Sequence, residues 1–518
     1  MTLKKLLSVL LVVAMVCIMA TGCGSSGSNS NTSNDTTSDA AQNKQSNENN
    51  ATEIVVTFLT FGQTPKDLPL VQDEVNKITV PKIGVKIKFY PIPIADTFTK
   101  YSTLLAGKEN IDLMITAFQD IQPFVNSGSL MPLDNYISEN SNIQKFIEEY
   151  GVTDGAKIDG KTYGIGPTTT LGFQGAVILG NDYLKNAGLT IDTEKEYSLE
   201  ELSSIFGALK KANPNVYPCG ALGSSVVNGA SSFRFFHVID SLGANTTSGV
   251  LMDTTSTKIV DMYETEEYYN FLKAMKEWYK AGYIMPDAAT NDTPADTLIM
   301  SGVLGSSIMN NNPAVLASLQ AKLKGGGTPA STTPVYRPSV SSATGIYSTV
   351  PTYSKKAEAA LKFLDLTFAD DSLSNLLQWG IEGKHYKVVD EANGIIDFAD
   401  GLDATTSGYY NTLGVWGNQN NLLTFSKFST KAANLAYIEK ARANPTKAVG
   451  YQYNSSKMVN QLVAINTVLN QYLPTLETGS EKDLDTTYNA FIKALKAANI
   501  DAVIADNQAQ FDAWLANR

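Results

Sequence analysis

Residues 52–60, TEIVVTFLT, decide the fold class of this chain. The stretch consists mostly of β-branched and apolar residues, which predicts a buried β-strand. Apolar residues at helical spacing follow over 68–78, and a second strand-like stretch, VKIKFY, follows at 85–90. A strand, a helix and another strand in this order form a βαβ unit, and such units build parallel sheets. The pattern therefore predicts an α/β protein.

The same alternation continues along the chain. Residues 95–105 and 120–126 have helical patterns, and residues 111–116, IDLMIT, form another strand pattern. The stretch GGGTPASTTP at 325–334 is the clearest internal loop, and helices are expected to dominate from Lys355 onward. The remaining predicted strands are 173–179, 303–309 and 344–350, and the remaining predicted helices are 199–211, 233–242, 266–281, 459–472, 484–498 and 500–515.

The N-terminal stretch has the pattern of a secretory signal peptide. Two lysines precede an apolar run over 6–19, and small residues follow the run. The run is too short to be a convincing membrane-spanning helix. Residues 20–23, Ala-Thr-Gly-Cys, resemble a bacterial lipobox, which makes 1–22 the signal and Cys23 the lipidated first residue of the mature chain. The alternative is an ordinary signal peptide that happens to end near a cysteine.

A polar segment separates this cysteine from the rest of the chain. Residues 24–52 are mostly Ser, Asn, Thr, Asp, Gln and Gly, with no aromatic or large aliphatic residue. Such a segment buries too little apolar surface to offset its conformational entropy, so residues 23–52 are expected to be a lipid-anchored, disordered tether. Its r.m.s. reach would be about 30 Å. We therefore expect a protein anchored on the extracytoplasmic face of the cell membrane, as on a Gram-positive cell surface.

Composition and charge exclude several classes of protein. The chain has 518 residues, of which 43% are hydrophobic and 18% charged, which suits two or three globular domains or two large lobes. The formal net charge is −11 and no segment gathers Lys and Arg, so nucleic-acid binding is not expected. Of the three cysteines, Cys17 lies in the signal, Cys23 is the expected anchor and Cys219 is interpreted as a buried apolar residue, so no intrachain disulfide is expected.

Motifs of enzyme sites give no catalytic prediction. Residues 155–162 match the phosphate-binding pattern GxxxxGK[ST], but the Asp-Gly pair at 159–160 predicts a hairpin turn where that motif needs the start of a helix. The sequence contains no GxSxG, HExxH or CxxC motif, and its two histidines, His237 and His385, are far apart in the sequence. We therefore predict no catalytic residue, no metal site and no cofactor.

Several segments resemble those of one protein family, in the order in which they occur there. They are residues 65–78, WYKAGYI at 278–284, KKAEAALKFLD at 355–365, WGIEGKHY at 379–386 and the C-terminal residues 495–515. The chain resembles the extracellular solute-binding lipoproteins of bacterial ABC importers, family 1, in the long carbohydrate-type form with a helical C-terminal extension. The resemblance spans nearly the whole mature chain.

The resemblance implies a two-lobed, hinged fold of the periplasmic-binding-protein type II, with a helical C-terminal extension. The expected lobes are 53–167 plus 285–345 and 168–284 plus 346–518, with crossings of the chain near 167–171, 285–286 and 345–347. The lobes would close around a ligand, and the closed form would dock on the membrane permease subunits of an ABC importer. The protein is expected to be a monomer.

Such a protein is expected to bind its ligand at the carboxyl ends of its strands. Loops with amide, carboxylate and aromatic side chains follow three predicted strands, and the segments WGIEGKHY and LGVWGNQNN offer further candidates. The predicted ligand-binding residues are Phe61, Gln63, Phe118, Gln119, Asp120, Asn310, Asn311, Trp379, Glu382 and Trp416. Amides pair with hydroxyl groups and aromatic rings pack on sugar C–H faces, so we predict a neutral oligosaccharide, with a peptide or a modified sugar as alternatives.

These candidates also have structural interpretations. A lone Trp or Phe is often a core residue, and Asn runs are often turns or caps. His385 is interpreted as a structural hydrogen-bonding residue, with ligand contact as the alternative. The acidic composition disfavours an anionic ligand unless Arg234 or Arg337 enters the cleft. A surface-anchored glycosidase, with Asp120 and Glu382 as its two carboxylates, and an adhesin are the alternative functional classes.

Overall fold

The predicted βαβ unit is present at the start of the fold. Strand β1 (Thr52–Thr60) pairs in parallel with β2 (Val85–Pro93), and helix α2 (Leu68–Ile83) connects them. A proline in its first turn favours the start of α2, and Gly84 ends the helix in the left-handed conformation, with φ of 65°. The predicted α/β fold class is therefore confirmed for this part of the chain.

The structure is a computed structural model. It describes residues 50–60, 63–117, 121–168, 172–242, 246–320, 322–339 and 345–517. The signal peptide, the lipidation site Cys23 and nearly all of the predicted tether lie outside the described residues, as do four ligand-binding candidates, Phe61, Phe118, Gln119 and Asp120.

A first hydrophobic core, called the first core below, forms around this unit. It contains buried residues from 54–165 and from 346–438. Strand β3 (Met114–Thr116) joins β1 through the parallel bridge between Val56 and Leu113 and pairs antiparallel with β9 (Tyr347–Thr349). The helices of these segments are α3 (Thr97–Ala106), α4 (Gln122–Asn126), α5 (Asp134–Ile137), α6 (Ser141–Tyr150), α12 (Ala357–Ala369), α13 (Asp371–Trp379) and α14 (Lys431–Ala443).

A second core contains buried residues from 176–330 and from 448–511. Its sheet is antiparallel and has the order β7–β6–β8, with β6 at Gly175–Gly180, β7 at Ser306–Asn310 and β8 at Gly327–Ser331. Its helices are α7 (Asn181–Ala187), α8 (Leu199–Ala212), α9 (Glu266–Lys280), α10 (Ala295–Met300), α11 (Pro313–Gln320), α15 (Val459–Leu476), α16 (Leu484–Ala497) and α17 (Ile500–Ala516).

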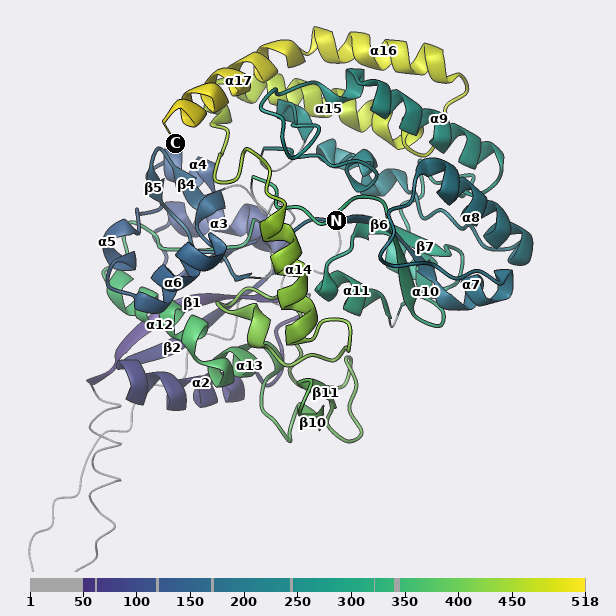
Figure 1. The fold of residues 1–518 in the computed structure, drawn as a ribbon. Coiled ribbons are helices and arrows are strands. Elements are labelled where there is room, and N and C mark those ends of the chain that lie inside the picture. Colours follow the sequence, from purple (N-terminus) through teal and green to yellow (C-terminus); the bar gives the residue numbers. More distant parts are fainter. Residues whose placement is uncertain are drawn as a thin grey trace, which may run out of the picture. The chain divides into compact units, whose positions relative to one another are not determined.

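The predicted C-terminal helices are confirmed, and they are part of the second core. Ile465, Leu469 and Leu473 recur every four residues on one face of α15 and are fully buried. Phe491 of α16 and Phe511 of α17 are also fully buried in this core. Figure 1 shows these three helices together with α9. Because their large side chains fill the second core, the C-terminal helices contribute directly to its stability.

The packing corrects the predicted assignment of segments to lobes. Residues 285–345 were expected with the first lobe, but β7 and β8 form the second sheet with β6. Residues 346–438 were expected with the second lobe, but β9, α12 and α13 pack in the first core. Met285 is buried in the second core, so the chain does not cross near 285–286. It crosses instead between Ile438 and Ala448.

Three local predictions also need correction. Residues 325–334 were expected to be a loop, but they contain β8, an edge strand in which Pro329 lies opposite Ile178. Residues 233–242 were expected to be an α-helix but contain only the short 3-10 helix at Ser232–Phe235. The predicted helical region after Lys355 also contains an antiparallel hairpin, β10 (Tyr386–Asp390) and β11 (Ile395–Phe398).

The segment with the phosphate-binding pattern is a β-hairpin, as its turn predicts. Strands β4 (Lys157–Ile158) and β5 (Lys161–Thr162) pair antiparallel around Asp159 and Gly160, whose φ angles are 50° and 75°. Two successive positive φ angles are typical of a type I′ turn. The backbone here therefore cannot wrap a phosphate before a helix.

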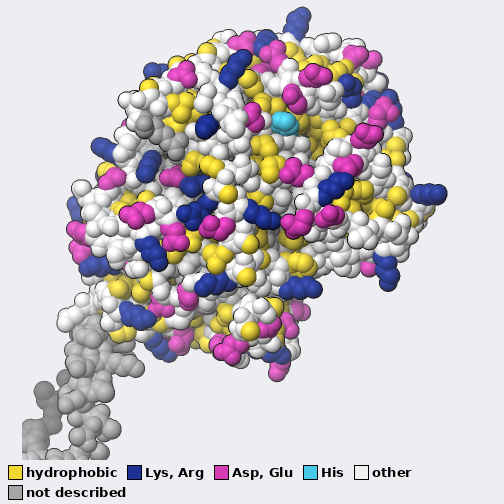
Figure 2. All heavy atoms as spheres, in the orientation of Figure 1, with side chains coloured by type: hydrophobic (Ala, Val, Ile, Leu, Met, Phe, Trp, Pro, Cys, Tyr) yellow, Lys and Arg dark blue, Asp and Glu magenta, His cyan; other side chains and the backbone are white. Residues whose placement is uncertain are grey.

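The surface carries mixed charges on the face drawn in Figure 2, where Lys and Arg side chains are interspersed with Asp and Glu. Within the described ranges, no helix is both long enough and apolar enough to cross a membrane.

Candidate functional site

The strands of the first sheet end at one common edge. β1 and β2 are parallel from Thr52 opposite Val85 to Thr60 opposite Pro93, and β3 continues the parallel order. β9 is antiparallel to β3, so it begins, at Tyr347, beside the end of β3. The carboxyl ends of β1, β2 and β3 therefore lie at the sheet edge where β9 begins.

Two strands of the second sheet also end beside a crossing of the chain. Asn310, the last residue of β7, lies opposite Gly175, the first residue of β6, and Ser331 at the end of β8 lies opposite Ala176. Both β7 and β8 therefore end where the chain arrives from the first core to begin β6.

Three segments connect the two cores at these edges. We call them the first (166–174), second (332–345) and third (439–447) crossing segments. Phe173 of the first bridges Tyr336 of the second, and Arg337 of the second bridges Pro445 of the third. The described parts of the crossing segments therefore run side by side, and the region around them is called the junction below.

Amide side chains form a hydrogen-bonded network at the junction. Asn310 Oδ1 accepts hydrogen bonds from the backbone N–H of Gln174, at 3.0 Å, and from the hydroxyl of Tyr437 on α14, at 3.2 Å. Asn311 donates from Nδ2 to Gln174 Oε1 at 3.1 Å, and Gln174 donates from Nε2 to the carbonyl of Thr333 at 3.3 Å. Amide side chains therefore connect the end of β7 with the first and second crossing segments, and Tyr437 connects α14 to the same network.

One oxygen of the network has no protein partner. Asn311 Oδ1 is buried and accepts no hydrogen bond. Leaving such an oxygen unsatisfied costs about 1–3 kcal/mol, which a hydroxyl group of a ligand or a water molecule would recover.

Aromatic rings and an arginine flank the first crossing segment. The ring of Phe235 stacks on Phe173, with centroids 5.7 Å apart, and the guanidinium of Arg234 lies 4.8 Å from the centre of the Phe235 ring. Burial lowers the pKa of Arg234, and its Nε has no hydrogen-bond partner. Arg337, in contrast, forms an ion pair with Asp154 of the first core. Arg234 therefore brings to the junction a donor, Nε, that has no hydrogen-bond partner.

A family model described as bacterial extracellular solute-binding protein matches residues 75–381, which is more than half of the chain. The chain belongs to this family. A second model, a domain of unknown function (DUF3502), matches residues 447–516, which contain α15, α16 and α17. The predicted family resemblance is confirmed at this level, and extracellular solute-binding proteins act outside the cytoplasm.

Relatives of this solute-binding protein include a carbohydrate ABC transporter substrate-binding protein of Streptococcus pneumoniae, 23% identical over 90% of this chain and 91% of the relative. The solved structure of the N-glycan transport solute-binding protein NgtS from S. pneumoniae is 21% identical, with a TM-score of 0.76, covering 90% of this chain and 99% of NgtS. The S. pneumoniae protein FusA, solved with kestose, is 14% identical, with a TM-score of 0.61, covering 90% of this chain and all of the FusA chain. These similarities confirm the predicted solute-binding fold with its helical C-terminal segment.

Of the ligand candidates that the structure of this solute-binding protein describes, only Asn310 and Asn311 belong to the amide network. Gln63 is exposed, three residues after the end of β1. Glu382 lines a separate hollow of about 390 Å³ between α2 and α13.

The two tryptophan candidates have different surroundings. Trp379 is half-buried, donates from Nε1 to the carbonyl of Leu423 at 2.7 Å and stacks on Tyr410. Trp416 is fully buried among Phe58 and Phe363 of the first core. The structure therefore reassigns Trp416 to the core, since its ring has no surface that a ligand could contact.

His385 has a structural environment. It is buried, its Nδ1 accepts a hydrogen bond from the backbone N–H of Ile381 at 2.8 Å, and its Nε2 lies 3.1 Å from Asp67 Oδ2. Burial lowers the pKa of His385, whereas the hydrogen bond from His385 lowers the pKa of Asp67. His385 therefore ties the WGIEGKHY segment to the start of α2, in agreement with its structural interpretation.

Four residues at the junction were not among the predicted ligand-binding residues: Gln174, Thr333, Tyr437 and Phe235. Thr333 lies two residues after the end of β8, so the rule that selected Asn310 would have selected it had β8 been predicted, whereas Gln174 precedes the start of β6, where that rule does not apply. Tyr437 lies on an α-helix, and its helical spacing carries no signal of its role.

Proposed function

We propose that this solute-binding protein captures a neutral oligosaccharide at the junction and delivers it to the membrane permease subunits of an ABC importer. It would do so as a monomer held on the extracytoplasmic face of the membrane by a lipid on Cys23. The names of its relatives support this proposal, since one is a carbohydrate ABC transporter substrate-binding protein and NgtS was solved with Man1GlcNAc and with Man5GlcNAc.

The observation that carries the proposal is the convergence of strand ends at the junction. The carboxyl ends of β3, β7 and β8 lie beside the strand starts that adjoin the crossing segments, and β1 and β2 end at the same sheet edge as β3. Ligands of open α/β sheets bind outside the carboxyl ends of the strands. A ligand there would contact both sheets. Its binding would therefore stabilise a closed arrangement, in which both cores contact the ligand.

The chemistry of the junction suits sugar hydroxyl groups. The network of Gln174, Asn310 and Asn311 has both donors and acceptors, and Asn311 Oδ1 is buried without a donor. The half-buried ring of Phe235, which stacks on Phe173 of the first crossing segment, offers an apolar face of the kind that packs on sugar C–H groups. Gln174, Asn310, Asn311 and Phe235 carry no carboxylate and so do not form a catalytic carboxylate pair. We therefore propose that the protein binds the sugar without hydrolysing it.

A thermal-shift screen tests this function. Neutral oligosaccharides, monosaccharides, peptides and anions are each added to the purified protein. A ligand at 100 times its dissociation constant stabilises a folded protein by about 2.7 kcal/mol. We expect the largest increase in Tm with an oligosaccharide, which should be recovered unchanged from the mixture. A shift with peptides but with no sugar, or hydrolysis of the sugar, would contradict the proposal.

A further inference from the structure

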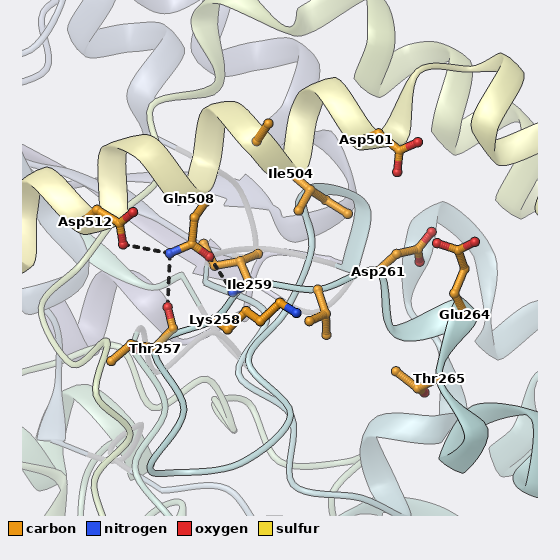
Figure 3. Close-up of a pocket in the computed structure, with 12 residues that line it drawn as sticks. Thr257, Lys258, Ile259, Asp261, Glu264, Thr265, Asp501, Ile504, Gln508 and Asp512 are labelled. Atoms are coloured by element: carbon orange, nitrogen blue, oxygen red, sulfur yellow. Dashed lines mark hydrogen bonds between the residues drawn. The ribbon is translucent and has the colours of Figure 1, made fainter.

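A second hollow surface lies between residues 257–269 and the C-terminal helices α16 and α17. A pocket of about 720 Å³ is formed by residues 257–265 on one side and by α17 on the other (Figure 3). A smaller hollow of about 340 Å³ shares Glu264 and Thr265 with it and continues toward Tyr269 of α9 and Tyr488 of α16. The two hollows together are called the C-terminal groove below.

One glutamine holds the two walls of the larger hollow together. Gln508 of α17 donates from Nε2 to the carbonyl of Thr257 at 3.0 Å, and its Oε1 accepts from the backbone N–H of Ile259 at 2.7 Å. The larger hollow of the groove therefore depends on the contact of α17 with residues 257–259.

The lining of the groove combines an apolar floor with an acidic rim. Ile259, Val260 and Ile504 line the floor. The acidic residues of the lining are Asp261, Glu264, Glu266, Asp485, Asp501 and Asp512. Lys258 is the basic residue of the lining, and nearby Lys496 pairs with Glu264 at 2.5 Å and with Asp501 at 2.6 Å. Six carboxyl groups and one ammonium group therefore line the groove, and Lys496 and Lys273 lie beside it, so acidic groups outnumber basic ones and leave the groove negative.

Asp261 is the residue of this surface that most clearly lacks a partner. Its side chain lines the larger hollow and is only 8% exposed. Oδ1 accepts a hydrogen bond from the backbone N–H of Tyr263 at 3.0 Å, whereas Oδ2 is buried and has no partner. Figure 3 shows its carboxylate beside that of Glu264, with Asp501 of α17 nearby. A buried carboxylate oxygen without a partner is costly, and a cation that binds it would remove that cost.

The groove is not arranged for a metal ion. In the described part of the chain, no group of three Asp, Glu, His or Cys side chains has a metal-binding arrangement. An arginine or lysine side chain fits better, because its apolar stem can cover the floor while its charged end reaches the rim. The two hollows share Glu264 and Thr265, and their rim residues Glu264, Asp501 and Asp512 are exposed, which suits a segment that spans both hollows.

We propose that the C-terminal groove docks a segment of a partner protein in which arginine or lysine alternates with apolar residues. A second copy of this chain is a poor candidate, because its net charge is −11. The chain's own N-terminal segment is also a poor candidate, because residues 24–52 contain one basic residue, Lys44, and no large apolar residue. This role goes beyond oligosaccharide capture, and it gives the C-terminal helices a function in addition to filling the second core.

Peptide titration tests this proposal on the full-length protein. The probe is an acetylated and amidated pentapeptide, Leu-Arg-Leu-Arg-Leu, and its control carries uncharged citrulline in place of each arginine. We expect the arginine peptide to bind at least tenfold more tightly than the citrulline peptide. Asp261→Asn and Asp501→Asn should each weaken it by roughly five- to tenfold, because each removes a charge-assisted contact. Glu391→Gln removes an exposed carboxylate outside the groove lining and should change nothing.

A pH titration gives a second readout at Asp261. Burial raises the pKa of Asp261 to about 7, and the charged groups that face it are Glu264, Lys496 and Asp501. The affinity of wild type for the arginine peptide should therefore fall as the pH is lowered from 8 to 6, and Asp261→Asn should show a smaller change. If Asp261→Asn does not fold, the affinity of Asp501→Asn for the same two peptides tests the proposal, because Asp501 is exposed and its substitution should not impair folding.

Three results would overturn the proposal. They are equal binding of the arginine and citrulline peptides, equal losses in Glu391→Gln and in the groove variants, and wild-type affinity in the folded groove variants. The oligosaccharide-induced Tm shift should persist in both groove variants, which separates a failure here from a failure of the proposed function.

Discussion

The hydroxyl of Tyr437 donates a hydrogen bond to Oδ1 of Asn310 at 3.2 Å. Tyr437 lies on α14, whose residue Ile438 is buried in the first core, whereas Asn310 ends a strand of the second sheet. This single contact therefore joins the two cores beside the first crossing segment. Gly172 permits it, because a Cβ at that position would lie 2.5 Å from Cε1 of Tyr437.

We predict that Asn310→Ala weakens oligosaccharide binding about tenfold and lowers the free energy of unfolding by about 2 kcal/mol, because it leaves the Gln174 N–H and the Tyr437 hydroxyl without an acceptor. Tyr437→Phe removes one donor and should cost about 1 kcal/mol. Calorimetric titration and urea unfolding measure the two effects. Asn393→Ala, in the exposed turn between β10 and β11, is the matched control. Wild-type affinity in Asn310→Ala would remove this amide from the site.

Two substitutions of Trp416 separate a core role from a ligand contact. Trp416→Ala should lower the free energy of unfolding by about 3–5 kcal/mol, as expected for a large side chain removed from a core. Trp416→Phe should cost less, because the indole N–H that it removes is buried without an acceptor. Urea unfolding measures both losses. If Trp416→Phe were stable but lost its sugar affinity, the reassignment of Trp416 to the core would be wrong.

Asp240 holds the second and third crossing segments together. It is 1% exposed, and it accepts hydrogen bonds from the backbone N–H and the hydroxyl of Ser339, both at 2.6 Å, and from the hydroxyl of Thr446. Asp240→Ala would leave these donors buried without an acceptor, so we expect a loss of about 3–5 kcal/mol in unfolding free energy. Hydrogen exchange at the Ser339 amide should accelerate in a variant that still folds. Unchanged protection of that amide would show that Asp240 does not restrain the crossing segments.

Glu477 should make the stability depend on pH. It is 1% exposed and accepts hydrogen bonds from Ser231, Ser232 and Tyr268, and burial raises its pKa to about 7 from 4.5. The folded state therefore holds this proton more tightly than the unfolded state. The resulting stabilisation is fully present below pH 4.5 and is lost as the pH rises through 7, by about 3 kcal/mol at most.

The measurement for Glu477 is the free energy of unfolding in urea at pH 5 and at pH 7.5. Wild type should be less stable at the higher pH, and Glu477→Gln should reduce the difference. Asp261, whose pKa is also raised to about 7, contributes in the same pH window, so the double variant with Asp261→Asn should reduce it further. An unchanged pH dependence in both variants would contradict this assignment.

Local patterns in the sequence predicted most single elements, because their signals are local. The β-branched run of β1 and the four-residue apolar spacing of α15 each determine an element without reference to the rest of the chain. Strand β8 was missed because Gly327 and Pro329 are typical of loops, and it exists only because the backbone of β6 pairs with it. The lobe to which β7, β8 and β9 belong was predicted wrongly, since apolar patterns show that a strand is buried but not which sheet it joins.

The candidate site was predictable only where a strand end marks it. Asn310 and Asn311 follow a recognisable strand, and the rule that ligands bind at strand ends selected them. Gln174 and Tyr437 are single polar residues on a crossing segment and on a helix, and no motif marks them. The ligand-binding roles of Gln63, Trp379 and Glu382, and those of Phe61, Phe118, Gln119 and Asp120, which lie outside the described residues, stay predictions.

A crystal structure with the neutral oligosaccharide that gives the largest thermal shift would test the central claim most directly. We predict sugar density at the junction, with a hydroxyl group within hydrogen-bond distance of Asn311 Oδ1, the oxygen that has no protein partner. Sugar density confined to the hollow beside Glu382, or to the C-terminal groove, would contradict the proposal that this protein captures its ligand between its two cores.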